Sequence, residues 1–146
     1  MTAVVLDVPT ATGAVKTMPE QVHPIMRTDF LSLEPDMPIR QAAGLLLSSS
    51  HDGAPVLDET GSLVGILTQK DCFRPALQAS YYQTWRGTVA DQMTRAVTAI
   101  DADAELTAAA EKFLTESYRA FPVLRSGRVV GWLRREDVLR RMVELG

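Results

Sequence analysis

Apolar positions follow the same order of spacings twice along the chain. In each half a short apolar run, residues 30–33 or 97–100, precedes a segment whose apolar residues recur every three or four positions. This pattern predicts a strand followed by an amphipathic helix. The helix-face positions are Ile39, Ala42, Ala43, Leu46 and Leu47 in the first half, and Leu106, Ala109, Ala110, Phe113 and Leu114 in the second.

Polar residues between these segments predict where the helices begin. Asp36 and Asp103 precede the two helical patterns, so we expect them to cap the helices, and Pro38 is compatible with a first helical turn. Two more apolar runs follow in each half, joined by turn residues at 58–61 or by Ser126 and Gly127, which predicts a hairpin.

A final helix is expected from Gln69 in the first half and from Arg135 in the second. Pro75 should kink or restart the first of these, because it lacks the N–H that would bond back to Asp71. Each half therefore reads as strand, helix, strand, strand, helix.

The residues themselves repeat along with the spacing. A shift of 67 positions, from Ile25 to Gln92, places Met26 on Met93 and Pro55 on Pro122. After the hairpin turn, which is one residue shorter in the second copy, the shift becomes 66 and places Gly65 on Gly131. A gap confined to a turn indicates duplication.

The duplication predicts how the chain is organised. We expect a tail or edge strand over residues 1–18, with residues 3–8 as the candidate strand, one repeat over 19–79, a linker over 80–88 and a second repeat over 89–146. Half a chain of this size buries little apolar surface, so each copy should need the other, with the two packed about a pseudo-two-fold axis.

One phrase is repeated with a change that matters chemically. Residues 65–71 read GILTQKD and residues 131–137 read GWLRRED. In the first, Thr68 is a natural helix N-cap and Asp71 can return the bond as a capping box, which stabilises a helix by ~1 kcal/mol. The same carboxylate at a helix start could instead accept both hydroxyls of a ribose, while the helix dipole favours a phosphate nearby. Both roles can hold together.

The second copy departs from this pattern at Arg134. Arginine cannot cap as threonine does, and Arg134 and Arg135 together oppose the positive end of the helix dipole, yet Asp137 persists. Two hypotheses remain open. Arg134 turns the second site toward more negatively charged phosphate groups, or it fills that site with its own side chain.

Taken together, these motifs resemble the tandem cystathionine β-synthase (CBS) domain pair, also called a Bateman module, over residues 22–144. The first phrase matches the family pattern V-G-h-h-T-x-x-D, where h is any apolar residue, and the second departs at Arg134. The resemblance implies an α/β fold (α+β type) of two βαββα repeats that bind AMP, ADP or ATP in clefts between them, with NAD or S-adenosylmethionine also possible. It implies no required cofactor, a regulatory role, and often a disc-shaped homodimer.

The remaining candidate site residues surround the two phrases. Apolar residues that could sandwich a purine are Phe30, Ala54, Pro55, Val97, Phe121 and Pro122, although each could equally be plain core. By resemblance Arg119 is the better phosphate ligand, whereas His51 beside Asp52 is a weaker candidate; by itself Arg119 could also be a solvated loop cation.

Composition and charge narrow the function. The 146 residues are 46% hydrophobic and 23% charged, a globular composition, and the net charge of −3 leaves no overall basic footprint for nucleic acid or anionic membrane. The N-terminal stretch has neither a signal-peptide nor a spanning pattern, so a cytoplasmic location is expected. The single cysteine, Cys72, excludes an internal disulfide.

Enzyme activity is not expected. Asp101, Asp103 and Glu105 alternate as in an EF-hand, but Leu106 and Lys112 stand where glycine and glutamate are needed. No motif ties Cys72 to a histidine, and there is no P-loop or G-x-S-x-G. The prediction is a sensor that passes nucleotide occupancy to an unidentified protein partner. The alternative is a dimerising adaptor with closed sites; the aromatic residues Tyr81, Tyr82 and Trp85 could serve a dimer surface or ordinary packing.

Overall fold

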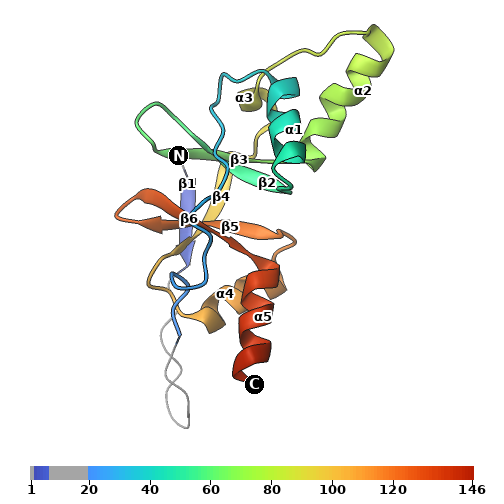
Figure 1. Cartoon of the computed structure of the whole chain (residues 1–146). Coiled ribbons are helices and arrows are strands. Elements are labelled where there is room, and N and C mark those ends of the chain that lie inside the picture. The colour runs from blue at the N-terminus through green and yellow to red at the C-terminus, as the bar shows by residue number, and fades with distance from the viewer. Residues whose placement is uncertain (1, 7–19) are drawn as a thin grey trace. The chain divides into compact units, whose positions relative to one another are not determined.

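The computed structural model describes residues 2–6 and 20–146, and these fall into two compact units (Figure 1). Unit 1 comprises residues 30–97, and unit 2 comprises residues 20–29 and 98–146 of the described chain. Strand β1 (Thr2–Leu6) is divided between the units. The chain thus passes from unit 2 into unit 1 after Asp29 and returns after Val97.

Unit 1 is built around the antiparallel hairpin of β2 (Gly53–Leu57) and β3 (Leu63–Thr68). Single bridges extend this hairpin on both sides, Leu33 with Val56 in parallel and Ile66 with Thr94 antiparallel. Its helices are α1 (Ile39–Ser48), α2 (Phe73–Tyr82), which follows a 3-10 turn at Lys70–Cys72, and the short α3 (Val89–Gln92).

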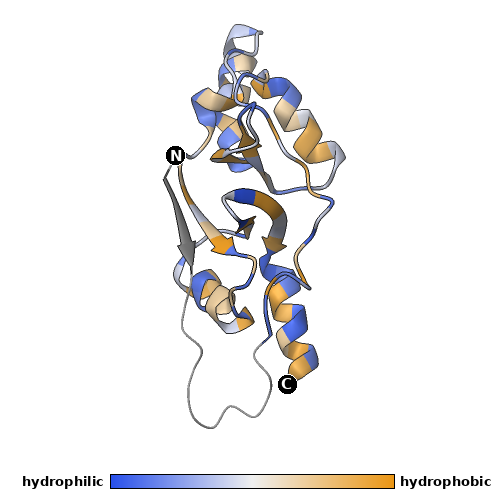
Figure 2. Ribbon diagram, turned by 90° about the vertical axis from the view of Figure 1, so that its left-hand side faces the viewer, coloured by the Kyte–Doolittle hydropathy of each residue, from blue (hydrophilic) through white to orange (hydrophobic). Residues whose placement is uncertain are grey.

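Unit 2 repeats this plan with a longer first strand. Strand β4 (Ala96–Asp101) pairs in parallel with β5 (Ala120–Arg125), and β5 pairs antiparallel with β6 (Arg128–Arg134). Strand β1 lies at the edge of this sheet beside β4. The helices are α4 (Leu106–Thr115) and α5 (Arg135–Leu145), and short groups of polar and apolar residues alternate along α5 in Figure 2.

Each unit completes its core with a segment from the other sequence copy. Residues 20–29, at the start of the first copy, bring Val22 into the core of unit 2, where it packs with Phe121 and Leu133. Residues 87–97, at the start of the second copy, bring Val89 and Met93 into the core of unit 1. Neither copy by itself therefore contains the whole core of a unit.

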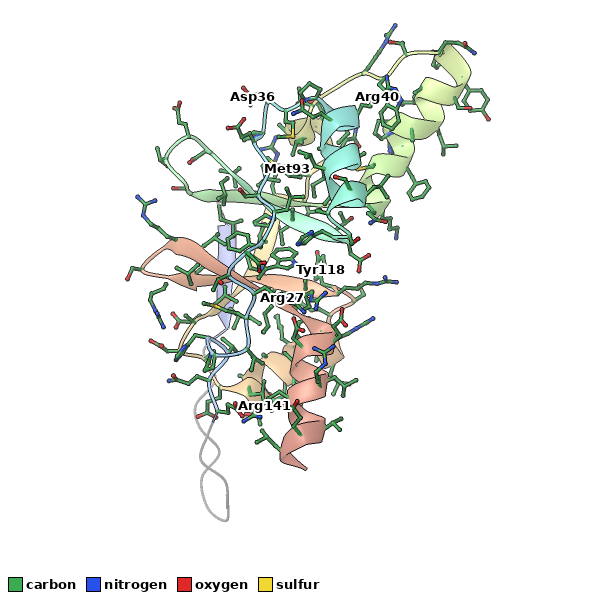
Figure 3. All side chains as sticks on the ribbon, in the orientation of Figure 1. Arg27, Asp36, Arg40, Met93, Tyr118 and Arg141 are labelled. Carbon is green, nitrogen blue, oxygen red and sulfur yellow. The ribbon has the colours of Figure 1, made fainter. Side chains whose placement is uncertain are left out.

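The repeated glycines explain how closely these leading segments approach the hairpins. A Cβ placed on Gly65 would lie 2.6 Å from Sδ of Met93, which is labelled in Figure 3. A Cβ on Gly131 would collide in the same way with Sδ of Met26. The two methionines and two glycines that the repeat aligns are thus paired across the copies, because only glycine leaves room for the thioether.

Most of the predicted elements are confirmed. Both hairpins form, and Ser126 and Gly127 adopt the positive φ angles, 53° and 77°, of a two-residue turn. The strand predicted over 97–100 is part of β4. The first final helix restarts at Phe73, two residues before Pro75, and the second begins at Arg135.

Three local predictions are wrong. Residues 30–33 form no strand, because Leu33 alone pairs with β2. Asp36 and Asp103 do not cap, since the helices begin later, with Pro38 and Glu105 at the N-cap positions. Leu47 and Leu114 are 66% and 85% exposed, because each lies outside the buried face of its helix.

The candidate edge strand at 3–8 corresponds to β1, although residues 7–19 lie outside the described part of the chain. None of the helices in the described residues is long and apolar enough to cross a membrane.

Candidate functional site

Hairpin register brings the repeated phrase of each unit next to the loop that precedes its first hairpin strand. In unit 1 Gly53 lies opposite Thr68, and the Gln69 amide donates to the carbonyl of Asp52 at 2.8 Å. In unit 2 Ala120 lies opposite Arg134, and the Arg135 amide donates to the carbonyl of Arg119, also at 2.8 Å. The candidate phosphate loops and the candidate ribose acids are therefore neighbours in both units.

Thr68 and Asp71 form the capping box that the sequence predicts. The backbone N–H and Oγ1 of Thr68 donate to Oδ2 of Asp71 at 2.8 and 3.0 Å, and the Asp71 amide returns a bond to Oγ1 at 3.4 Å. Both bonds to the carboxylate end on the same oxygen. Among the described residues none donates to Oδ1, and the side chain is partly exposed. This acid therefore keeps acceptor capacity for a ligand.

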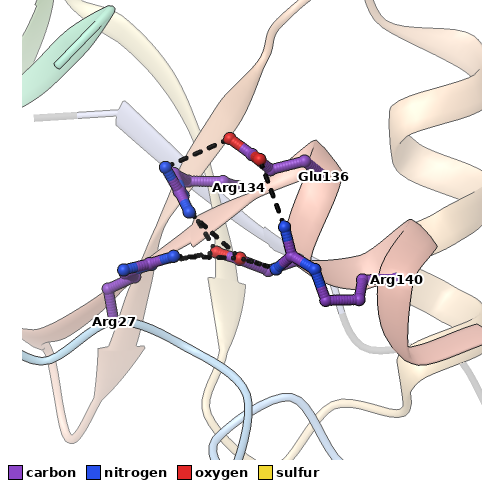
Figure 4. Close-up of polar contacts among 5 residues, drawn as sticks. Arg27, Arg134, Glu136 and Arg140 are labelled. Atoms are coloured by element: carbon purple, nitrogen blue, oxygen red, sulfur yellow. Dashed lines mark hydrogen bonds and ion pairs between the residues drawn. The ribbon is translucent and has the colours of Figure 1, made fainter. Parts of the chain in front are cut away.

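Asp137, the equivalent acid of unit 2, is held by three arginines (Figure 4). Arg134 donates to both carboxylate oxygens at 3.0 and 3.2 Å, Arg27 donates to both at 3.3 and 3.4 Å, and Arg140 donates to Oδ1 at 3.0 Å. Glu136 in turn pairs with Arg134 and Arg140. We call Arg27, Arg134 and Arg140 the arginine clamp.

The clamp decides the charge state of Asp137. The side chain is only 7% exposed, and such burial alone would raise its pKa. Hydrogen bonds from Arg134 and Arg27, together with their positive charges, outweigh burial and hold the pKa of Asp137 below its ordinary value. Asp137 is therefore a carboxylate whose acceptor positions are already filled by strong, charge-assisted bonds.

The predicted purine walls are mostly buried. Ala54 and Phe121 are 0% and 1% exposed and belong to the cores of their units. Pro55, Pro122 and Val97 are also buried, whereas Phe30 is partly exposed and Arg119 is exposed. Contact with a ligand by Ala54 or Phe121 would thus fall to their backbone atoms, and a role for the other residues stays a prediction.

Sequence reasoning missed Arg27 and Arg140. Arg140 is three residues from Asp137 on one helix, a spacing that brings side chains together and would have revealed it. Arg27 lies 110 positions from Asp137, and only the antiparallel bridge between Arg27 and Trp132 brings them together. The available signal was the repeat itself, which aligns Arg27 with Thr94 just as it aligns Arg134 with Thr68.

Cys72 lies next to Asp71 but is not activated. It is 7% exposed, its Sγ lies 3.6 Å from the carbonyl oxygen of Thr68, and burial together with the negative charge of Asp71 raises the pKa of the thiol. A raised pKa keeps the sulfur protonated and weakly nucleophilic. Within residues 2–6 and 20–146, no group of three His, Cys, Asp or Glu side chains is placed to hold a metal ion.

Known proteins with similar structures bind adenosine derivatives. A crystal structure described as CBSX2 in complex with AMP is 26% identical and superposes with a TM-score of 0.75, covering 86% of this chain and 98% of that one. The CBS domain pair of protein MJ0100, in complex with 5′-methylthioadenosine and S-adenosyl-L-methionine, is also 26% identical, with a TM-score of 0.74 over 88% of this chain and 100% of that one.

Among curated sequences, the protein MJ1225 of Methanocaldococcus jannaschii is 25% identical over 121 residues. That match covers 83% of this chain, which spans only 42% of the length of MJ1225. The model of the CBS domain family matches residues 22–76 and again residues 87–144, so both copies carry the family's sequence pattern. The two units also repeat one plan of helix, hairpin and helix. The chain therefore belongs to the CBS domain family and consists of a tandem CBS domain pair.

Proposed function

We propose that this chain is a regulatory module that binds an adenosine-containing nucleotide without transforming it. The observation that carries the proposal is the Asp71 carboxylate, whose Oδ1 accepts no hydrogen bond from the described residues. The two neighbouring hydroxyls of a ribose can both donate to one carboxylate. The bonds from Thr68 already hold the Asp71 carboxylate in a fixed orientation for such a ligand.

The ligand class follows from what lies around Asp71. The loop at His51 and Asp52 adjoins the start of the 3-10 turn through Gln69, and the dipole of the helix that follows favours a phosphate near this loop. AMP, ADP and ATP supply both the ribose and the phosphate. NAD and S-adenosylmethionine also contain adenosine and remain within the same ligand class. That similar CBS pairs were crystallised with AMP, 5′-methylthioadenosine and S-adenosylmethionine supports the same ligand class here.

A second capping box in unit 1 provides a matched control for the ribose role. Thr88 and Asp91 form the same box, with the Thr88 amide donating to Oδ2 of Asp91 at 2.9 Å. Asp71→Ala should weaken AMP binding at least tenfold, about 1.4 kcal/mol, in titration calorimetry. Asp91→Ala should lose comparable helix stability and keep the affinity. Equal AMP affinity in Asp71→Ala and the parent protein would remove the ribose role.

The rival function, a dimerising adaptor with closed sites, differs in its response to ligand. A nucleotide at 100 times its dissociation constant stabilises a binding protein by about 2.7 kcal/mol. For a chain of this size that raises the melting temperature by roughly 5–10 °C. An adaptor would show no shift with AMP, ADP, ATP, NAD or S-adenosylmethionine.

We also propose that the module forms a homodimer through equivalent helix faces. Phe73 and Leu77 of α2 are 65% and 59% exposed, and their counterparts in the repeat, Leu139 and Val143 of α5, are 63% and 71% exposed. Each pair is four residues apart and so shares a helix face. Large apolar residues exposed at the same positions of both copies favour self-association.

The dimer proposal has a direct test. Substituting Leu77→Asp together with Val143→Asp should convert a dimer to a monomer in light scattering coupled to size-exclusion chromatography. A parent protein that elutes as a monomer at micromolar concentration would contradict it. Nucleotide binding can then affect a protein partner only if the nucleotide binds one conformation of the module more tightly than another. The size of the effect is limited by that difference in affinity.

A further inference from the structure

Asp71 and Asp137 occupy equivalent positions in their units but differ in what they contact. Each follows the last residue of a hairpin strand by three positions, at the start of the final helix. Asp71 accepts from Thr68 alone among the described residues, whereas Asp137 accepts five hydrogen bonds from three guanidinium groups. The duplication has therefore produced one acid with spare acceptor capacity and one without.

Two substitutions account for this difference, at positions 27 and 134. In unit 1 Thr94 bridges Ile66, with N···O distances of 2.9 Å in both directions. In unit 2 Arg27 bridges Trp132 with the same two distances. The side chains of residues 27 and 94 therefore start from equivalent backbone positions in the two units. Both substituted positions carry threonine in unit 1, Thr68 and Thr94, and arginine in unit 2.

An arginine near the acid is not enough to form the clamp. Arg74 of unit 1 is the counterpart of Arg140, yet within the described residues it makes no ion pair with Asp71. Arg27 and Arg134 supply four of the five bonds to Asp137. These two residues are therefore the ones that distinguish the second acid from the first.

A nucleoside cannot readily displace these contacts. Both a guanidinium and a ribose hydroxyl can donate charge-assisted hydrogen bonds to a carboxylate, but only the guanidinium adds the attraction between opposite charges. A ligand that used Asp137 would also have to separate it from Arg27, whose ion-pair partner it is among the described residues, and from Arg134. Arg134 would keep its ion pair with Glu136, but the loss of the pairs with Asp137 carries a further cost.

We infer that Arg27 and Arg134 determine ligand specificity by closing the acid of the second repeat to ribose, so that each chain binds one nucleotide, through Asp71. This inference rests on the proposed function, and it adds to the ligand class the number of nucleotides that each chain binds. Of the two hypotheses for Arg134, the inference favours the one in which the Arg134 side chain fills the second site, not the one in which it binds phosphate.

The reciprocal exchange of residues tests the inference by titration calorimetry with AMP. The parent chain should bind one AMP per chain. Arg27→Thr combined with Arg134→Thr gives unit 2 the residues of unit 1 and should raise the number of bound AMP molecules to two. Thr68→Arg should reduce AMP binding at least tenfold. Arg125→Thr, which removes an exposed ion pair of unit 2 with Asp103, is the control and should leave one AMP per chain.

The outcomes separate this inference from the proposed function. Two AMP molecules per parent chain, or loss of AMP binding in Asp137→Asn, would overturn the inference and leave the nucleotide-binding function standing. A folded Arg27→Thr, Arg134→Thr variant that still binds one AMP would also overturn it. Should the double variant fail to fold, Arg134→Thr alone and Asp137→Asn decide the question in the same titration. A parent chain that binds no adenosine ligand removes the proposed function, and this inference with it.

Discussion

Replacing Asp137 by alanine removes the acid from the centre of the arginine clamp. The variant loses five hydrogen bonds, and Arg27, Arg134 and Arg140 are left close together, with Glu136 still paired with two of them. The equivalent change in unit 1, Asp71→Ala, removes only the bonds from Thr68. The two variants therefore delete the same group from equivalent positions with different surroundings.

The magnitude follows from exposure. Hydrogen bonds to charged groups contribute about 1.5–3 kcal/mol when shielded from water, whereas exposed ion pairs contribute about 0–1 kcal/mol. Asp137 is 7% exposed, but the side chains of Arg27, Arg134 and Arg140 are 46%, 29% and 55% exposed. About 1 kcal/mol per arginine, or ~3 kcal/mol in total, is therefore a fair estimate. Losing the capping box in Asp71→Ala should cost ~1 kcal/mol.

Urea unfolding followed by circular dichroism measures both variants against the parent chain without added nucleotide. The transition midpoint of Asp137→Ala should fall clearly further than that of Asp71→Ala. The difference in unfolding free energy should be ~2 kcal/mol, which corresponds to roughly 4–8 °C in melting temperature. High salt should narrow the gap, because mobile ions screen partly exposed charges.

Equal losses in the two variants, within about 0.5 kcal/mol, would show that the arginines contribute nothing to stability beyond an ordinary helix cap. A gap that did not change between low and high salt would refute the electrostatic origin and leave only packing.

Three further predictions concern pH, the repeated glycines and the thiol. The depressed pKa of Asp137 means that the clamp stabilises the fold at neutral pH, and this contribution is lost as pH falls below the unfolded carboxylate value of ~3.9 toward the folded pKa. The stability gap between the parent chain and Asp137→Ala should therefore shrink in urea titrations between about pH 5 and pH 2. Gly65→Ala should destabilise by ~1–3 kcal/mol, since its Cβ would meet Met93; adding Met93→Ala should cost less than the sum of the two single changes, and strict additivity would contradict the contact. Cys72 should resist a thiol-specific reagent until the chain unfolds, and Cys72→Ala should bind AMP as the parent does; rapid labelling of the folded protein would contradict its burial.

Several features were predictable because they depend on residues close together in the sequence. Thr68 and Asp71 are three residues apart, so their capping box follows from helix geometry alone. The turn at Ser126 and Gly127 follows from a Ser-Gly pair between two apolar runs, because Gly127 adopts a positive φ without strain. Exact helix starts were less predictable, because Asp36 and Asp103 are better N-cap residues than Pro38 and Glu105, which occupy the N-cap positions in the structure.

The duplication, the order of elements in each copy, and the presence of Thr68 beside Asp71 but Arg134 beside Asp137 could all be read from the residues in order. Three-dimensional packing was needed to show that the leading segment of each copy completes the core of the other unit, and hence that Arg27 reaches Asp137. The physical reason is that spacing along a helix or strand reports neighbours a few residues away, whereas contacts between distant residues depend on strand pairing and on apolar packing. Arg27 contacts Asp137 because its backbone pairs with Trp132 and because Met26 beside it fits only against a glycine.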